Sequence, residues 1–243
     1  ALAPDEERAA IQEWHKALAF RSVEIRKQIV ELEDLFAKHD QRILLLKGAA
    51  RLFDDLYPDS SCRYSVDIDA LIEDPQMFYK ASALGYQIFD DPAFDMKTIR
   101  SGDISVATGP AFHHLPALYR DGEQASIELH THPFTTKYDD LAIPDLWEKA
   151  QPPARHPAIL LPSLPHELTI NIIHTLFHGL AKEQFSLSVR DLFEGHLLYT
   201  RATGAERAQV KAHFTQNGYG KDFDLWRSVC FRVFENPLYR VPE

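Results

Sequence analysis

The sequence predicts an α+β protein with a long N-terminal helix, an α/β region and a helical C-terminal region. Three observations support this fold class. Apolar residues recur at helical spacing through residues 1–39, short apolar runs typical of strands alternate with helical patterns over 40–150, and helical periodicity returns after prolines that begin near residue 152. We therefore expect an N-terminal helical segment (1–39), an α/β domain (40–150) and a helical subdomain after a linker (151–243).

The first helix is predicted by apolar residues at three- and four-residue steps, with neither glycine nor proline after Pro4 to interrupt them. These residues are Ile11, Trp14, Leu18, Ile25, Ile29, Leu32 and Phe36. The run Ile43-Leu44-Leu45-Leu46 then predicts a buried strand, because it is too short for a helix.

The α/β region continues with a mixture of helices and strands. We expect helices over 49–57, ended by Pro58, and over 76–84, ended by Gly85. Strands are expected over 63–72, 86–88, 94–99 and 103–107. Asp121-Gly122, between 112–120 and 123–130, predicts a two-residue β-hairpin turn.

The C-terminal region begins with a proline-rich stretch that predicts a stiff linker. Its prolines are Pro152, Pro153, Pro157, Pro162 and Pro165. Beyond them, the periodicity predicts helices over roughly 165–182, 187–201, 205–217 and 221–235.

Composition limits the classes of function. The 243 residues include 26 basic and 36 acidic side chains, and the resulting charge of −10 disfavours non-specific binding to nucleic acid. Apolar runs fall short of the ~20 residues that cross a bilayer, so we expect no membrane partner. The two cysteines, Cys62 and Cys230, are too few for a disulfide framework and favour a cytoplasmic protein.

Two carboxylates in a predicted strand form the first candidate site. Asp67 and Asp69 are two residues apart, so both project from one face of the strand. Like charges this close disfavour each other unless a cation lies between them, and their oxygen atoms suit Mg²⁺ or Mn²⁺. In a chain with 36 acidic residues, such a pair also occurs as two solvated acids near a strand end.

Two further motifs favour the functional interpretation. Glu128 lies between apolar neighbours at the end of another predicted strand, where it supplies a third carboxylate. Lys47-Gly48 lies at a strand-to-helix junction, where glycine permits close approach of the backbone and lysine adds a positive charge for phosphate. Carboxylates and a phosphate-binding turn together indicate metal-assisted phosphate chemistry.

These motifs, in this order, resemble the uncharacterised nucleotidyltransferase family of the polymerase-β-like nucleotidyltransferase superfamily. The resemblance runs from about residue 43 to about residue 200. It rests on Leu46-Lys47-Gly48-Ala49-Ala50, Leu56-Tyr57-Pro58, Arg63, Asp67-Ile68-Asp69, Gly85-Tyr86, Glu128-Leu129-His130 and the later His174, His178 and Asp191-Leu192.

The resemblance implies a mixed-sheet nucleotidyltransferase-like domain and a metal-dependent reaction. A nucleoside monophosphate would pass from an NTP to an acceptor hydroxyl, with release of pyrophosphate. Asp67, Asp69 and Glu128 would hold Mg²⁺ or Mn²⁺ and act in catalysis. Independently of the resemblance, the position of His130 on the same strand favours a role in orienting Glu128, and the acidic charge balance favours a small molecule or a protein as the acceptor.

One element departs from the superfamily pattern. The usual Gly-Ser, whose serine grips the triphosphate, is replaced here by Gly48-Ala49. Lys47, Gly48, Arg63 and Ser65 are then the expected nucleotide-binding residues. The departure also leaves open a protein that keeps the fold and binds a partner without catalysis.

The histidines give a further alternative. Glu128, His130 and His132 alternate along one strand, so a metallohydrolase would use both histidines with an aspartate of the neighbouring strand. His174 and His178 share one face of a predicted helix, where paired core histidines are a simpler interpretation than a metal site. Arg190-Asp191 is interpreted as a structural ion pair, and His113-His114 receives no role.

Overall fold

The computed structural model describes residues 5–59, 62–107, 112–178 and 188–234. The chain forms two compact units. Unit 1 is Ala1–Pro133 with Ala150–Leu161, and unit 2 is Phe134–Lys149 with Pro162–Glu243. The α+β fold class is confirmed, while the three-part division at residues 39 and 150 stays a prediction.

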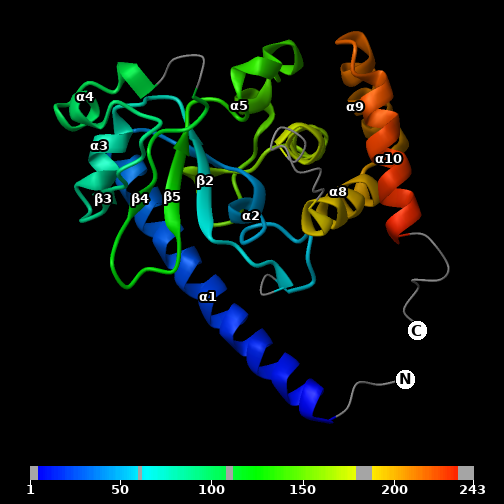
Figure 1. The fold of residues 1–243 in the computed structure, drawn as a ribbon, viewed down its shortest axis with the longest axis horizontal. Helices are drawn as coiled ribbons and strands as arrows, with labels where there is room; N and C mark the ends of the chain where they lie inside the picture. The colour runs from blue at the N-terminus through cyan, green and yellow to red at the C-terminus, as the bar shows by residue number, and fades with distance from the viewer. Residues whose placement is uncertain (1–4, 60–61, 108–111, 179–187, 235–243) are drawn as a thin grey trace. The chain divides into compact units, whose positions relative to one another are not determined.

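Unit 1 is built on a six-stranded mixed sheet (Figure 1). Its strand order is β3-β4-β5-β2-β1-β6. β2 and β5 are parallel, as are β1 and β6, and the other neighbours are antiparallel. The strands are β1 (Ile43–Leu45), β2 (Asp67–Ile72), β3 (Gln87–Ile88), β4 (Leu118–Tyr119), β5 (Ser126–His130) and β6 (Ile159–Leu160).

The long helix α1 (Asp5–Lys38) supplies one side of the core of unit 1 and runs behind the sheet in Figure 1. Ile25 and Ile29 are buried with apolar side chains of β1, β2 and β5. Ile11 and Trp14 follow the same periodicity, but their side chains are 62% and 65% exposed. The predicted helix is therefore confirmed, although only its second half contributes to the core.

The predicted hairpin turn is confirmed at Asp121-Gly122, where the Glu123 N–H donates to the Arg120 carbonyl at 3.1 Å, but the connection is longer than the two residues predicted, because β4 ends at Tyr119 and β5 begins at Ser126. β4 pairs antiparallel with β5, with Leu118 opposite Ile127. Gly122 has φ +85°, a left-handed conformation that glycine adopts without strain. Gln28 of α1 holds the residue that precedes β5. Its side-chain amide N–H donates to the Ala125 carbonyl at 3.0 Å, and its side-chain oxygen accepts from the Ala125 N–H at 3.2 Å.

Several predicted elements of unit 1 are wrong. Residues 94–99 are not a strand, because the Asp95 side chain caps the helix α4 (Met96–Arg100). Residues 103–107 contain the 3₁₀ helix η2 (Ser105–Ala107). The predicted helix 49–57 is reduced to the four-residue α2 (Lys47–Ala50), whereas α3 (Met77–Ser82) is confirmed. The proline-rich stretch is more than a linker, since it contributes β6 to the sheet.

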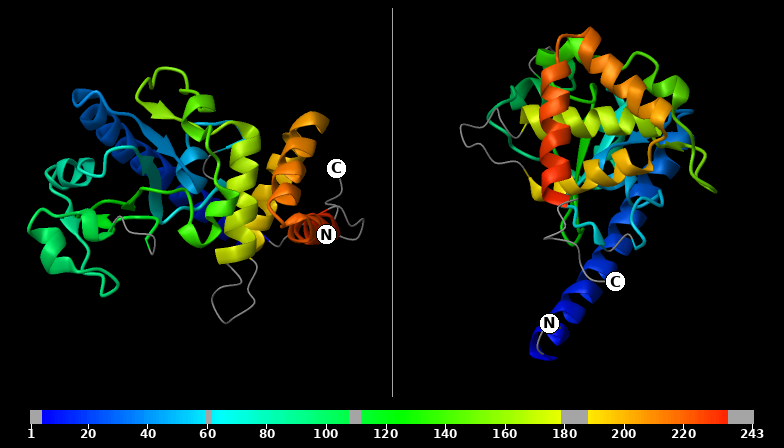
Figure 2. Two further views of the ribbon diagram at one scale, coloured as in Figure 1. Left: turned by 90° about the horizontal axis from the view of Figure 1, so that it is seen from above. Right: turned by 90° about the vertical axis from the view of Figure 1, so that its right-hand side faces the viewer.

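Unit 2 is helical, as predicted. α9 and α10 lie side by side (Figure 1 and Figure 2), and buried Phe214 of α9 contacts buried Phe223 of α10. The described parts of this unit contain η3 (Thr136–Leu141), α5 (Leu146–Lys149), α6 (Leu164–Ile173), the π-helix η4 (His174–His178), α8 (Val189–Arg201), α9 (Gly204–Gln216) and α10 (Gly220–Phe234). The predicted helical positions 179–182, 187 and 235 lie outside the described residues. Among the described helices, none has both the length and the apolarity that a membrane span requires.

Candidate functional site

Strand register brings the predicted carboxylates to one face of the sheet. In the parallel pair of β2 and β5, Asp69 lies opposite Glu128, and Asp67 lies opposite Ser126. Because side chains alternate along each strand, Asp67, Asp69 and Glu128 project together, away from the face that carries Ile68 and Ile127. Those two isoleucines are fully buried in the core, so the carboxylates occupy the opposite face.

Asp69 is the centre of this group. Its Oδ1 accepts from the Lys47 ammonium at 2.7 Å and interacts with His130 Nε2 at 2.9 Å. The Asp69 side chain is 3% exposed and that of His130 is fully buried. One ligand atom each from Asp69, Glu128 and His130 lies within 4.8 Å of the others. These three side chains are close enough together to hold one metal ion, whereas Asp67 is not part of this group although it projects from the same face.

The electrostatics of the carboxylates differ from one another. Burial raises the pKa of both Asp67 and Glu128, and the negative charge of Asp69 raises both pKa values further. Burial would also raise the pKa of Asp69, but Lys47 and His130 hold it far below its ordinary value. Asp69 is thus ionised at neutral pH, whereas ionisation of Asp67 and Glu128 beside it is disfavoured.

His130 is a positioning group for Asp69. Burial lowers the pKa of His130, so its imidazole is neutral at neutral pH. Because Asp69 is ionised, we assign the proton to Nε2, which then donates to the carboxylate. The other ring nitrogen, Nδ1, is buried and has no hydrogen-bond partner among the described residues. The sequence predicted that His130 would orient Glu128, but its hydrogen bond is to Asp69.

The predicted nucleotide-binding residues gather beside these carboxylates. Lys47 adopts φ +48°, which turns the chain sharply between β1 and α2. A Cβ on Gly48 would lie 2.1 Å from Ser65 Oγ and 3.2 Å from Arg63 Cζ, so only glycine leaves room for these side chains. Arg63 and Ser65 are themselves buried, and Arg63 donates to Ser65 Oγ at 3.4 Å. The four predicted nucleotide-binding residues, which come from two separate segments of the chain, therefore form one basic and polar cluster.

This donor set fits a divalent cation. Burial is the main cause of the raised pKa values of Asp67 and Glu128, and the negative charge of Asp69 adds to it, so a cation among these carboxylates would favour their ionised forms. Carboxylate oxygens suit Mg²⁺ and Mn²⁺, and an adjacent imidazole is also compatible with Mn²⁺. The short α2 adds little through its dipole, so an anion here would be held by the side chains and local N–H groups.

The histidines proposed for other sites are not brought to this point. Within the described residues, the group of potential metal ligands contains His130 but not His132, because β5 ends at His130. In unit 2, His174 Nε2 lies 3.7 Å from Asp191 Oδ2, and Arg190 forms an ion pair with Asp191 at 3.1 Å. The side chain of His178 lies outside the described residues.

The sequence interpretation missed the contribution of His113 and His114. Their rings lie 5.4 Å and 5.6 Å from that of His130, measured between centroids. His114 also forms an isolated bridge with His130, and a positive charge on His114 would lower the pKa of Glu128. Counting backwards from a two-residue turn would have placed His113 opposite His130, one residue away from the observed pairing of His114 with His130.

Comparisons with known proteins place this fold and site in context. The family described as uncharacterised nucleotidyltransferase matches residues 1–234 of the chain. The chain is also similar in structure to the antibiotic-resistance factor ANT(2'')-Ia, solved in solution, with a TM-score of 0.51 and 10% sequence identity. That likeness covers 81% of this chain and 93% of the other. No curated protein matches it by sequence.

Proposed function

The chain belongs to the uncharacterised nucleotidyltransferase family, and we propose that it catalyses metal-dependent transfer of a nucleoside monophosphate from an NTP to an acceptor hydroxyl, releasing pyrophosphate. The register of β2 and β5 carries this proposal. It sets Asp69 directly opposite Glu128 and puts Asp67 on the same face.

Asp67, Asp69 and Glu128 would hold the cations, with Mg²⁺ or Mn²⁺ as the expected ions. Two such ions at a phosphoryl centre can stabilise the attacking and the leaving oxygen of an in-line displacement. Glu128 has a raised pKa, which suits a carboxylate that accepts the proton of the acceptor hydroxyl. Asp69, ionised and held by Lys47 and His130, would keep a fixed orientation throughout.

Lys47, Gly48, Arg63 and Ser65 would bind the phosphates of the NTP. The superfamily serine that follows the glycine is absent, but Ser65 places its hydroxyl against Gly48 from another part of the chain. Arg63 lies beside it and contributes a guanidinium, which matches phosphate geometry. Ser65 would therefore replace the missing hydroxyl in function although it lies 17 positions after Gly48 in the sequence.

The acceptor is proposed to be a small molecule or a protein side chain. The charge of −10 disfavours a long polyanionic acceptor. The structural neighbour is an antibiotic-resistance factor, and at 10% identity its likeness supports the fold but not a shared acceptor.

The decisive experiment is a calorimetric titration of the protein with each NTP in the presence of Mg²⁺ or Mn²⁺. We expect binding that requires the cation and disappears in Asp67→Asn, Asp69→Asn and Glu128→Gln. Glu73→Gln, an exposed carboxylate just beyond β2, is the matched control and should bind normally. Absence of binding by every NTP with either cation would contradict the proposal. Binding with no release of pyrophosphate when small molecules or proteins that carry hydroxyl groups are supplied as acceptors would favour a non-catalytic member of the fold.

A further inference from the structure

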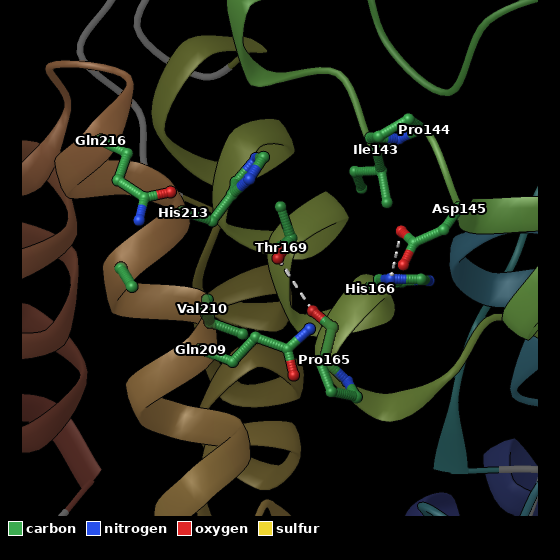
Figure 3. A pocket seen from close by; sticks show the side chains of 11 residues that line it. Ile143, Pro144, Asp145, Pro165, His166, Thr169, Gln209, Val210, His213 and Gln216 are labelled. Atoms are coloured by element: carbon green, nitrogen blue, oxygen red, sulfur yellow. Dashed lines mark hydrogen bonds and ion pairs between the residues drawn. The ribbon is translucent and has the colours of Figure 1, made fainter.

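Unit 2 contains a cavity of about 290 Å³ that uses none of the residues of the carboxylate site. Its walls are the segment 143–145, the start of α6 and one face of α9 (Figure 3). This volume is near the lower end of the range for small-molecule pockets. The cavity therefore has room for a small organic molecule.

One wall carries a paired carboxylate and imidazole. His166 Nε2 lies 3.1 Å from Asp145 Oδ1, and the whole of His166 is only 5% exposed (Figure 3). Its second nitrogen, Nδ1, is buried without a hydrogen-bond partner among the described residues. The Asp145 Oδ2 atom is paired with Lys149 at 2.5 Å, which lowers the pKa of Asp145, while burial lowers the pKa of His166. At neutral pH this wall presents an ionised carboxylate and a neutral imidazole.

The facing wall on α9 is also rich in acceptors. Gln209, His213 and Gln216 are spaced by four and three residues, so they share one face of the helix (Figure 3). His213 Nε2 lies 3.2 Å from the Leu141 carbonyl, and when it donates there the other ring nitrogen is an acceptor. Thr169, between the walls, already donates its hydroxyl to the Pro165 carbonyl at 2.8 Å. Its oxygen remains able to accept.

The balance of charge identifies the class of ligand. Among the described residues that line the cavity there is neither lysine nor arginine, and Asp145 carries the one formal charge. Lys149 lies outside the lining and pairs with Asp145 Oδ2, while Asp145 Oδ1 lies beside His166, so a ligand ammonium would share this carboxylate with Lys149. An anion would find no cation in the lining to offset its loss of water. A ligand that brings donors and a positive charge would instead match the acceptors. Ile143, Pro144 and Val210 supply apolar surface between the polar groups.

We propose that this cavity binds a small aliphatic amine, with an ammonium group at Asp145 and its carbon chain against Val210 and Pro144. Charge-assisted hydrogen bonds fix the ammonium, and burial of the methylene groups adds the hydrophobic contribution. Neither the reaction proposed above nor the family assignment is needed for this inference. Failure of one proposal therefore leaves the other standing.

Titration of the full chain with 1,4-diaminobutane and with its neutral isostere 1,4-butanediol tests the proposal by calorimetry. We expect the diamine to bind and the diol not to bind. Asp145→Asn should weaken the diamine by about tenfold or more, as expected for a hydrogen bond to a charged group. Asp224→Asn is the matched control, because it also breaks a lysine pair (to Lys211, 2.8 Å) but lies outside the cavity. That control should keep wild-type affinity.

A second pair of variants tests the cavity without removing its charge. Ala212 lines the cavity from α9 and is exposed, so Ala212→Phe should fill the space and abolish diamine binding. Ala208→Phe, exposed on α9 but outside the cavity, should leave binding unchanged. The proposal is overturned if wild type binds no diamine, if the diol binds as tightly as the diamine, or if Asp145→Asn or Ala212→Phe retains wild-type affinity.

Discussion

Replacing Lys47 by methionine removes the cation on which Asp69 depends. The Nζ–Oδ1 distance is 2.7 Å, and the side chains of Lys47 and Asp69 are 22% and 3% exposed. Removing one partner of a buried ion pair typically costs about 3–5 kcal/mol. Because Lys47 keeps some contact with solvent and His130 still donates to Asp69, we expect a loss of about 3 kcal/mol. Urea denaturation of the metal-free protein at neutral pH measures this change in the free energy of unfolding.

Lys16→Met provides a matched control on α1. Lys16 Nζ also lies 2.7 Å from a carboxylate, that of Glu13, but both side chains are more than 70% exposed at 72% and 73%. An exposed pair contributes less than about 1 kcal/mol. Both variants remove a lysine ammonium that lies 2.7 Å from a carboxylate oxygen, so the difference between their losses of stability measures the effect of burying the ion pair. If Lys47→Met costs no more than Lys16→Met, the electrostatic account of the site is wrong.

A double variant separates lost charge from lost packing. Adding Asp69→Asn to Lys47→Met removes the unpaired carboxylate, so much of the lost stability should return. We expect a coupling energy of about 2 kcal/mol, within the range for residues in direct contact. If the two substitutions were simply additive, the loss in Lys47→Met would come from packing of the lysine stem rather than from its charge.

Three further predictions concern the pH dependence and the packing of the two units. Glu128→Gln should stabilise the metal-free protein by about 1 kcal/mol at neutral pH. Because the pKa of Glu128 is raised in the folded protein, the stability that its protonated carboxyl contributes is lost as pH rises and the carboxyl ionises. The difference in stability between the variant and the wild type should therefore close as pH falls towards 4.5 in urea titrations. Gly195→Ala should cost about 1–3 kcal/mol, because its Cβ would lie 2.8 Å from a buried tryptophan ring, whereas Gly204→Ala has open space and should be nearly neutral in thermal melts. Ile29→Ala should cost about 2–5 kcal/mol and Ile11→Ala almost nothing, as judged by chemical denaturation, because the first is fully buried and the second is 62% exposed.

The face shared by Asp67 and Asp69 was predictable because alternation along a strand is a local property. The position of the hairpin turn was equally accessible, since Asp121-Gly122 fixes a turn through its own conformational preferences, but the register of β4 against β5 was not. Both features help to locate candidate catalytic residues from the local sequence alone, without knowledge of contacts between distant parts of the chain. The pairing of β2 with β5 is different, because a parallel neighbour far along the chain has no local signal.

Elements that depend on tertiary context were predicted less well. Ile11 and Ile29 belong to one periodic pattern, so the sequence does not distinguish the exposed part of α1 from the buried part. The two residues of β6 lie among prolines and become a strand only through pairing with β1. Residues 94–99 have apolar positions that resemble a strand, but the capping side chain of Asp95 favours a helix.

The location of the carboxylates is a consequence of the core on the other side of the sheet. Shifting β2 by one residue would turn Asp67 and Asp69 into the apolar layer and expose Ile68 and Ile72, each now buried. Burial of such side chains contributes roughly 1.5–3 kcal/mol each, so the apolar face fixes the register strongly. The charged face then follows the same register even though its own carboxylates repel one another. Substitutions of the carboxylates should therefore change binding of a cation while leaving the strand in place.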